Sequence, residues 1–470
     1  MKDMKKLIIT LAAFLLVWGG WYICFPYFMV WMEGSSFFTA LPDFLPVQYE
    51  LPGDLFNYMA SFLLKFFAYP AAGAAVQAAV PVFVAICVWL IVKRFFKDSD
   101  GLFWMSFLAV PAVVYLQLTD ITLVKVCVML TIVTAVTLAV LIINGFAGIS
   151  ARLPKFLKFK WLNYAVPALS VMFSIYLLHA GPLTRQHEAI ARLAYMGEHE
   201  DWDGILKSVS RQDALSNGFM RRYVLLALSE TDRLPDFAFR YGLSGADDFV
   251  IRQQDGPLAM KFNILFYRAL GLQNPVIYYA YQQSLQSSPG LSFDAMRTLA
   301  DAYIGLKDHD LAARYVDILD RSSFNRKWVR DRKEKLEAIR GAEPEYQMTG
   351  SRFIFKDFYN DITALVARYP ENKKYADYLL CALLADKNAG MFMNVFTQAA
   401  GHHYPDTRTM PVLYQEAMCL IATRDPQVLD RFPVNGTVWK RFADFTEMMS
   451  KGQTGQAKRK YADTYWAYVY

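Results

Sequence analysis

The chain of 470 residues is too long for one ordinary domain, so its length predicts at least two modules. Apolar residues make up 55% of it and aromatic residues 16%, whereas Asp, Glu, Lys and Arg together make up only 20%. Residues 1–180 hold 12 Lys/Arg and 8 Asp/Glu, and the remainder holds 37 and 35. The net charge of +6 therefore comes mostly from an apolar front part, which indicates membrane topology rather than a surface for nucleic acid.

Five apolar segments in the front part are long enough to cross a bilayer, which takes about 20 residues of helix. They run roughly over residues 7–29, 71–92, 102–118, 126–143 and 161–178. The first follows the basic start MKDMKK, as a signal peptide would, but WGGWYICFPYF offers no small-residue cleavage site. We therefore expect an uncleaved anchor. The third segment is the shortest and contains Pro111, which kinks a helix but is tolerated in membranes.

The loop between the first two segments carries three carboxylates in the stretch PDFLPVQYELPGD (42–54). Asp43, Glu50 and Asp54 fit two hypotheses. They are either exposed groups of a proline-stiffened outer loop or catalytic carboxylates beside the bilayer, as in some polytopic glycosyltransferases that use lipid-linked donors. Apolar residues at three- and four-residue spacing then predict an amphipathic helix over about 54–68 that lies along the membrane surface.

Basic residues give the five segments a direction, because Lys and Arg are retained on the cytoplasmic side. They precede the first segment (MKDMKK), follow the second (KRFFK) and precede the fifth (RLPKFLKFK), while the loops 30–70 and 119–122 are acidic or short. All three clusters agree with five crossings that begin inside. We predict a multi-pass membrane protein with a cytoplasmic N-terminus and a C-terminal domain on the outer side of the membrane.

The part of the chain beyond residue 185 shows helical periodicity with short polar breaks and no sustained alternation of period two. The clearest example is 298–324, where Leu299 and Ala300 form a large-then-small pair and Ala312 begins a second apolar face after the turn GLKDHD. This pattern resembles the tetratricopeptide repeat, whose large and small positions let two antiparallel helices interlock. The predicted fold class is all-α: about five transmembrane helices followed by a soluble tetratricopeptide-like solenoid.

The breaks in this pattern predict the domain organisation. In chain order we expect a membrane domain (1–180), a first helical-repeat domain (181–340), a linker (341–352) and a second helical-repeat domain (353–470). The linker begins with GAEPE and holds the longest run of Gly, Pro and polar residues. The aromatic cluster at the end of the chain predicts either a final capping helix or an exposed docking tip; its residues are Tyr461, Tyr465, Trp466 and Tyr468.

Few residues beyond 185 suggest chemistry. His199, in GEHEDWD, fits a turn between helices, and adjacent His402 and His403 point apart on a helix, so neither group predicts a metal site. Cys381 and Cys419 lie where packed helices take a small apolar side chain, which predicts buried free thiols. The sequence has no HExxH, GxSxG, Walker A, Rossmann or CxxC motif, and we predict no cofactor and no metal.

Three stretches carry a resemblance to a family of Gram-negative inner-membrane proteins that is labelled a domain of unknown function. They are FFTALPDFLP (37–46), ELPGDLFNYMASFLLKFFAYP (50–70) and KYADTYW (460–466). The resemblance implies N-terminal membrane helices, a helical repeat-like domain and an envelope location. It implies no active-site residues.

These expectations favour a membrane-anchored interaction protein over an enzyme. A large charged helical part without a catalytic motif predicts a scaffold that holds an envelope protein partner near the lipid bilayer. The alternative is a polytopic membrane enzyme of envelope glycan or lipid assembly, which would use Asp43, Glu50 or Asp54. The few polar residues within the apolar segments argue against a pump or a transporter.

Overall fold

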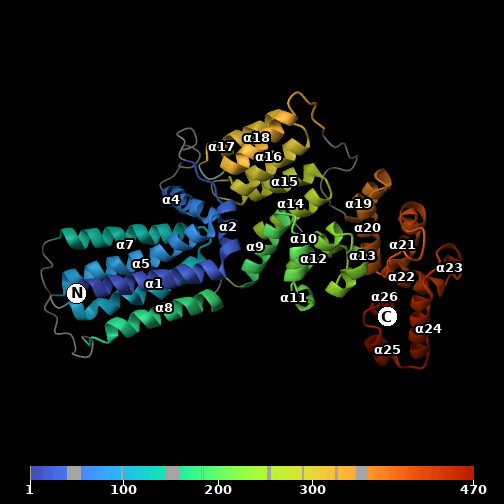
Figure 1. The fold of residues 1–470 in the computed structure, drawn as a ribbon, viewed down its shortest axis with the longest axis horizontal. Coiled ribbons are helices and arrows are strands. Elements are labelled where there is room, and N and C mark those ends of the chain that lie inside the picture. The colour runs from blue at the N-terminus through green and yellow to red at the C-terminus, as the bar shows by residue number, and fades with distance from the viewer. Residues whose placement is uncertain are drawn as a thin grey trace. The chain divides into compact units, whose positions relative to one another are not determined.

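The computed structural model describes residues 2–39, 54–96, 99–143, 159–181, 183, 185–250, 256–287, 290–322, 326–345 and 358–470. All regular structure in these ranges is helical, as the sequence predicts (Figure 1). The chain divides into two compact units. Unit 1 consists of Met1–Arg192 and Ala280–Tyr346, and unit 2 of Leu193–Tyr279 and Gln347–Tyr470. Unit 1 therefore combines the membrane-like front part with a stretch from the middle of the chain, a grouping that is not apparent from chain order.

Among its described residues, unit 1 contains five helical segments that are long and apolar enough to cross a membrane. The spans are Met4–Cys24 in α1 (Lys2–Cys24), Pro70–Phe95 (α5), Asp100–Thr119 (η3, Ser99–Leu108, and α6, Ala109–Thr119), Val124–Ile142 (α7) and Leu162–Ala180 (α8). Each corresponds to one predicted segment. The shortest predicted segment corresponds to a candidate span of 20 residues, Asp100–Thr119.

The first predicted segment ends earlier than expected. It was expected to reach residue 29, but α1 ends at Cys24 and a separate helix, α2 (Pro26–Gly34), begins two residues later. Pro26 is the first residue of α2, where its fixed φ suits a helix start and its missing N–H costs no hydrogen bond. The WGGWYICFPYF stretch is therefore divided between two helices: its first part ends α1, and the part from Pro26 begins the largely buried helix α2.

The outer faces of the five spans are apolar and uncovered. Ile23, Ile142 and Met172 are 77%, 74% and 66% exposed. A soluble monomer rarely presents contiguous apolar faces of this kind, whereas lipid tails cover them without cost. The exposed faces agree with placement in a bilayer.

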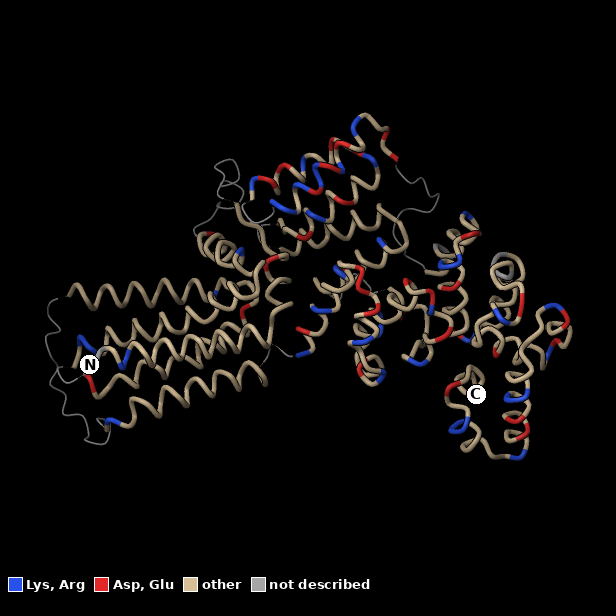
Figure 2. Tube along the Cα trace, in the orientation of Figure 1, with Lys and Arg blue, Asp and Glu red and all other residues tan. Residues whose placement is uncertain are grey.

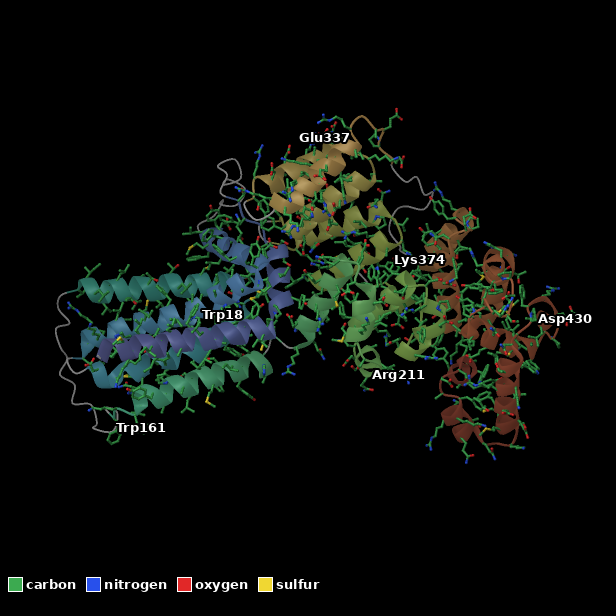
Figure 3. All side chains as sticks on the ribbon, viewed as in Figure 1. Trp18, Trp161, Arg211, Glu337, Lys374 and Asp430 are labelled. Atoms are coloured by element: carbon green, nitrogen blue, oxygen red, sulfur yellow. The ribbon has the colours of Figure 1, made fainter. Side chains whose placement is uncertain are left out.

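Basic residues at the start of α1 and at the end of α5 lie at one end of the bundle, where Figure 2 shows blue segments near the N-terminus, whereas Lys125 lies near the start of α7, at the other end. Lys6 Nζ lies 2.6 Å from Asp100 Oδ1, and Asn163 Nδ2 donates to the Asp100 carbonyl oxygen at 3.1 Å, so the ends of α1, η3 and α8 meet there. Trp161, at the start of α8, lies at this same end and is 62% exposed (Figure 3). These ends belong to spans from different parts of the chain, and the direction in which the spans cross the membrane stays a prediction.

Outside the spans, unit 1 contains the amphipathic helix and a set of three consecutive helices. The predicted surface helix over 54–68 is α4 (Asp54–Leu64) followed by the 3₁₀ turn η2 (Lys65–Ala68). The predicted helix pair over 298–324 is α16 (Phe293–Gly305) and α17 (His309–Asp320), which pack together; α18 (Arg326–Ala338) packs on α17. Leu299, Ala300 and Ala312 are all buried.

Unit 2 is built from short helices. Its first part contains α10 (Trp202–Ser208), α11 (Arg211–Ser216), α12 (Gly218–Glu230), α13 (Leu234–Phe237) and α14 (Pro257–Ala269). Its second part contains α19 (Phe358–Arg368), α20 (Lys373–Ala385), α21 (Ala389–Val395), α22 (Val412–Ala422), α23 (Val428–Arg431), α24 (Gly436–Ser450), α25 (Thr454–Lys460) and α26 (Tyr465–Val469). Helices α9 (Arg185–Glu198) and α15 (Gln273–Leu285) each carry the chain from one unit into the other.

The two parts of unit 2 are joined by packing and by ion pairs. Helix α13 packs on α20 and α22, and Lys374 Nζ lies 2.7 Å from Glu230 Oε1 (Figure 3). The terminal aromatic cluster belongs to this core, since Tyr461, Tyr465 and Trp466 are 4%, 2% and 0% exposed. Tyr468, the fourth residue of the cluster, is half-buried. The burial of the other three rings argues against an exposed docking tip, and the capping of a solenoid stays a prediction.

Candidate functional site

Of the three candidate carboxylates in the outer loop, the structure places one. Asp43 and Glu50 lie outside the described residues, as does the part of the predicted linker beyond residue 345. Asp54 is the first residue of α4, and its Oδ1 lies 3.4 Å from Asn57 Nδ2. A carboxylate in the first turn of a helix stabilises the helix through the free amides and the macrodipole. This placement accounts for Asp54 without catalysis.

The start of α2 is capped by a carboxylate from a distant part of unit 1. No side chain next to α2 caps it. Instead, the backbone N–H groups of Tyr27 and Phe28 donate to the two carboxylate oxygens of Glu188 in α9, at 3.1 and 2.8 Å. Burial raises the pKa of Glu188 to about 7, although both amide hydrogen bonds and Arg192 act in the opposite direction. Glu188 thereby fixes the position of α2 after the first span.

The other end of α2 is held by a buried ion pair. Glu33 is 2% exposed and lies 3.2 Å from Arg297 Nη2 of α16, and Arg297 also lies 3.3 Å from Asp294. The Phe293 N–H donates to the Ser36 carbonyl oxygen at 2.9 Å. Gly34 fits this contact because a side chain there would meet the Asp294 carboxylate. Helix α2 thus connects the spans to the helices α16–α18 of unit 1.

In the described part of the chain, no group of three or more His, Cys, Asp or Glu side chains is arranged to hold a metal ion. Cys24 Sγ lies 3.3 Å from His179 Nδ1, although the two residues are 155 positions apart in the sequence. His199 Nδ1 lies 2.8 Å from the carbonyl oxygen of Tyr195 in α9. His403 Nε2 lies 2.8 Å from the Pro370 carbonyl oxygen. His199 lies in the turn after α9, as predicted, whereas His403 ends the short 3₁₀ helix η10 (Gly401–His403).

A buried polar network lies in unit 2 around Asp377 of α20. Its carboxylate accepts from the hydroxyl groups of Tyr404 and Tyr414 and lies 3.4 Å from Lys373 Nζ. Burial raises the pKa of Asp377, and these three partners lower it. Burial also raises the pKa of the Cys381 thiol well above its ordinary value, so this cysteine stays protonated and is a poor nucleophile. Cys381 and Cys419 are both free and fully buried, as predicted.

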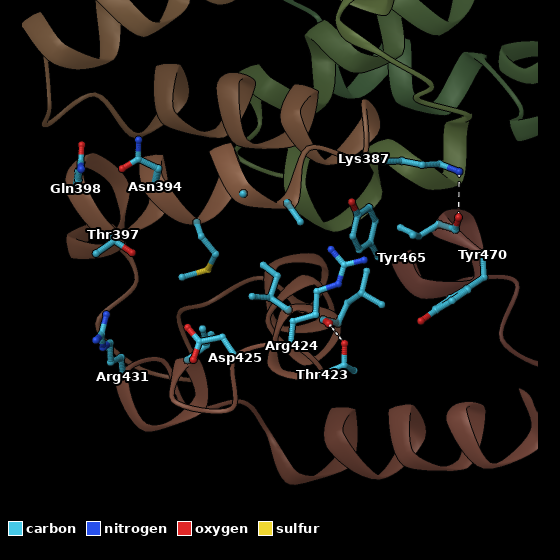
Figure 4. A pocket seen from close by; sticks show the side chains of 17 residues that line it. Lys387, Asn394, Thr397, Gln398, Thr423, Arg424, Asp425, Arg431, Tyr465 and Tyr470 are labelled. Atoms are coloured by element: carbon cyan, nitrogen blue, oxygen red, sulfur yellow. Dashed lines mark hydrogen bonds between the residues drawn. The ribbon is translucent and has the colours of Figure 1, made fainter. Parts of the chain in front are cut away.

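Unit 2 contains a pocket of about 630 Å³ lined by residues of α21, η9 (Phe396–Ala400), α22, α23 and α26 (Figure 4). This volume is typical of ligand-binding pockets, which span about 300–1,000 Å³. Its apolar lining includes Val428, which is 4% exposed, and the ring of Tyr465, whose hydroxyl donates to the Leu384 carbonyl oxygen. The polar lining includes Asn394, Thr397 and Gln398.

The charged residues of this pocket are mostly basic. Lys387, Arg424 and Arg431 line it together with one acid, Asp425. Lys387 Nζ donates to the Val469 carbonyl oxygen at 3.1 Å and is thereby engaged. No sequence pattern indicates this site. Its residues come from several short helices and the turns beside them between 387 and 470, and no spacing along the chain brings them together.

The comparisons with known proteins agree with the resemblance of the sequence. No curated protein and no solved structure matches the chain. A family model described as a family of unknown function, DUF6057, matches residues 2–183 and 154–470, which together cover nearly the whole chain. The chain therefore belongs to this family of unknown function, DUF6057.

Proposed function

We propose that this protein is a membrane-anchored scaffold that holds a protein partner at the outer face of a bacterial inner membrane. Its five apolar helices anchor it, and its extramembrane helices carry the binding surface. The observation that best supports the proposal is the rigid attachment of α16–α18 to the spans through α2, by Glu188 on one side and Arg297 on the other. A scaffold has to present its binding surface in a fixed place, and this attachment supplies one.

The finer architecture of the proposal is a tetratricopeptide-like stack with a concave face for a peptide. Helices α16 and α17 provide support because their large and small buried positions follow that pattern. Stacked helix pairs of this kind form extended binding surfaces.

Site-specific photocrosslinking of the full-length protein in intact cells tests the function. A photoreactive phenylalanine analogue is placed at one of two exposed positions, Leu285 (73% exposed) or Trp439 (42% exposed), where it can react with a bound partner. We expect a defined crosslinked protein from at least one of them. Met172, 66% exposed on the apolar face of α8, is the matched control and should give none. Absence of any crosslink at both extramembrane positions would contradict the scaffold.

The proposed orientation has a separate test. Five crossings from a cytoplasmic N-terminus place the C-terminus in the periplasm. Alkaline phosphatase fused after Tyr470 should therefore be active, and green fluorescent protein at the same position should stay dark. The same reporters fused after Phe96, at the end of α5, should give the opposite result. Cytosolic fluorescence from the Tyr470 fusion would overturn the orientation and the proposed location of the partner.

A further inference from the structure

We propose that the pocket of unit 2 binds an acidic peptide segment, with Arg424 and Arg431 as the contacts for its carboxylates. This inference rests on the proposed function, because it names the class of partner that the scaffold holds. The pocket is concave, of ligand-binding size and lined by three basic residues against one acid. Its charge is complementary to an anion.

The two arginines are available for a ligand. Arg424 follows the C-terminal end of α22 and Arg431 is the last residue of α23. Within the described part of the chain, neither guanidinium has an ion pair or a side-chain hydrogen bond, and Asp425, which also lines the pocket, pairs with neither of them. Lys374, at the start of α20, is by contrast paired with Glu230. A planar guanidinium without a partner matches the two oxygens of a carboxylate.

The remaining lining residues favour a peptide over another anion. Asn394, Thr397 and Gln398 offer both donors and acceptors to peptide bonds. The apolar part, which includes Met393 and Leu420, gives room to an aliphatic side chain between the acidic ones. A lipid headgroup or a free phosphate would leave the apolar part unused, whereas an acidic peptide uses both parts of the lining.

Fluorescence anisotropy on the full-length protein in detergent micelles tests the site. The probe is a fluorescein-labelled short peptide of alternating aspartate and leucine, and the control peptide has asparagine in place of aspartate. We expect the acidic peptide to bind, the neutral one to bind far more weakly, and added salt to weaken the complex. The double variant Arg424→Gln/Arg431→Gln should raise the Kd about tenfold or more, since hydrogen bonds to charged groups are the stronger ones.

Two further variants make the test sharper. Arg408→Gln is the matched control, because Arg408 is a 90% exposed arginine of unit 2 outside the pocket, and its Kd should equal that of the wild type. The charge-reversed Arg424→Glu/Arg431→Glu variant should instead bind a peptide of alternating lysine and leucine, which shows that a folded pocket is still present. These variants also separate a local effect from unfolding.

The outcomes separate this inference from the proposed function. Absence of binding by the wild type, an equal Kd for the double variant, or arginine-dependent binding of phosphatidylglycerol vesicles without peptide binding would each overturn the acidic-peptide site. If the crosslinks from Leu285 and Trp439 persist in the double variant, the scaffold function stands without this pocket. If the crosslinks are absent while the peptide binds, the site stands and the proposed function fails.

Discussion

The Arg297→Ala substitution should detach α2 from α16 and destabilise their contact by about 3 kcal/mol. Glu33 is 2% exposed, and removal of Arg297 leaves its carboxylate buried without the guanidinium at 3.2 Å. Breaking a buried ion pair by removing one partner costs about 3–5 kcal/mol, because the remaining charge stays desolvated. We expect the lower value of this range for Arg297→Ala, because the Arg297 side chain is 25% exposed and solvent partly screens its charge.

Hydrogen exchange of the full-length protein in detergent measures this effect directly. Amides of α2 should exchange about a hundredfold faster in the variant, because every 1.4 kcal/mol changes an equilibrium about tenfold. Arg340→Ala is the matched control: Arg340 pairs with Glu337 in the same unit, but both side chains are more than 60% exposed. The Arg340→Ala substitution should lower the stability of unit 1 by less than about 0.5 kcal/mol.

A double variant distinguishes the loss of the Arg297 charge beside Glu33 from the loss of packing. Glu33→Gln/Arg297→Met removes both charges and keeps most of the volume, so it should recover most of the protection in α2. If Arg297→Ala exchanged at the wild-type rate, the ion pair would not hold α2. If the α2 amides exchanged as fast in the double variant as in Arg297→Ala, the contact would depend on the packing of Arg297 over the Phe293 ring. The guanidinium carbon lies 5.6 Å from the centre of that ring.

The sequence predicts the elements of unit 1 well because each rests on a strong local signal. Runs of apolar residues mark the five spans, and three- and four-residue spacing marks α4. The error at the first span, which ends at Cys24 rather than at 29, comes from Pro26. The run of apolar side chains continues past that proline, but the helix does not.

The long-range contacts could not be predicted, because they join residues without a common pattern. Glu33 and Arg297 are 264 residues apart, and Glu188 is 160 from Phe28. One signal could have found Glu33, since a lone carboxylate in the apolar stretch FMVWMEG needs a cationic partner once it is buried. The pocket of unit 2 has no such signal, as exposed arginines occur throughout the chain.

Glu416 in α22 makes unit 2 sensitive to pH. Its carboxylate is 4% exposed and accepts the Tyr465 N–H at 2.7 Å, which ties α26 to α22. Burial raises the pKa of Glu416 from 4.5 to about 7, while the Tyr465 N–H and Arg441 act in the opposite direction. The folded state therefore binds the proton more tightly than the unfolded state. Its contribution to stability is fully present below pH 4.5 and is lost as the pH rises through about 7.

Glu416→Gln should consequently stabilise unit 2 at high pH and leave it unchanged at low pH. The amide keeps an acceptor for the Tyr465 N–H and cannot ionise, so the variant avoids a cost on the order of 2–3 kcal/mol that the wild type carries at pH 8. Hydrogen exchange of α22 and α26, compared between variant and wild type at each pH, should be slower in the variant at pH 8 and equal at pH 4.5. Glu447→Gln, at an exposed position on α24 beside Lys451, should show no gain at pH 8. A gain for Glu416→Gln that is the same at both pH values would mean that packing, and not the buried charge, limits the stability of α22 and α26.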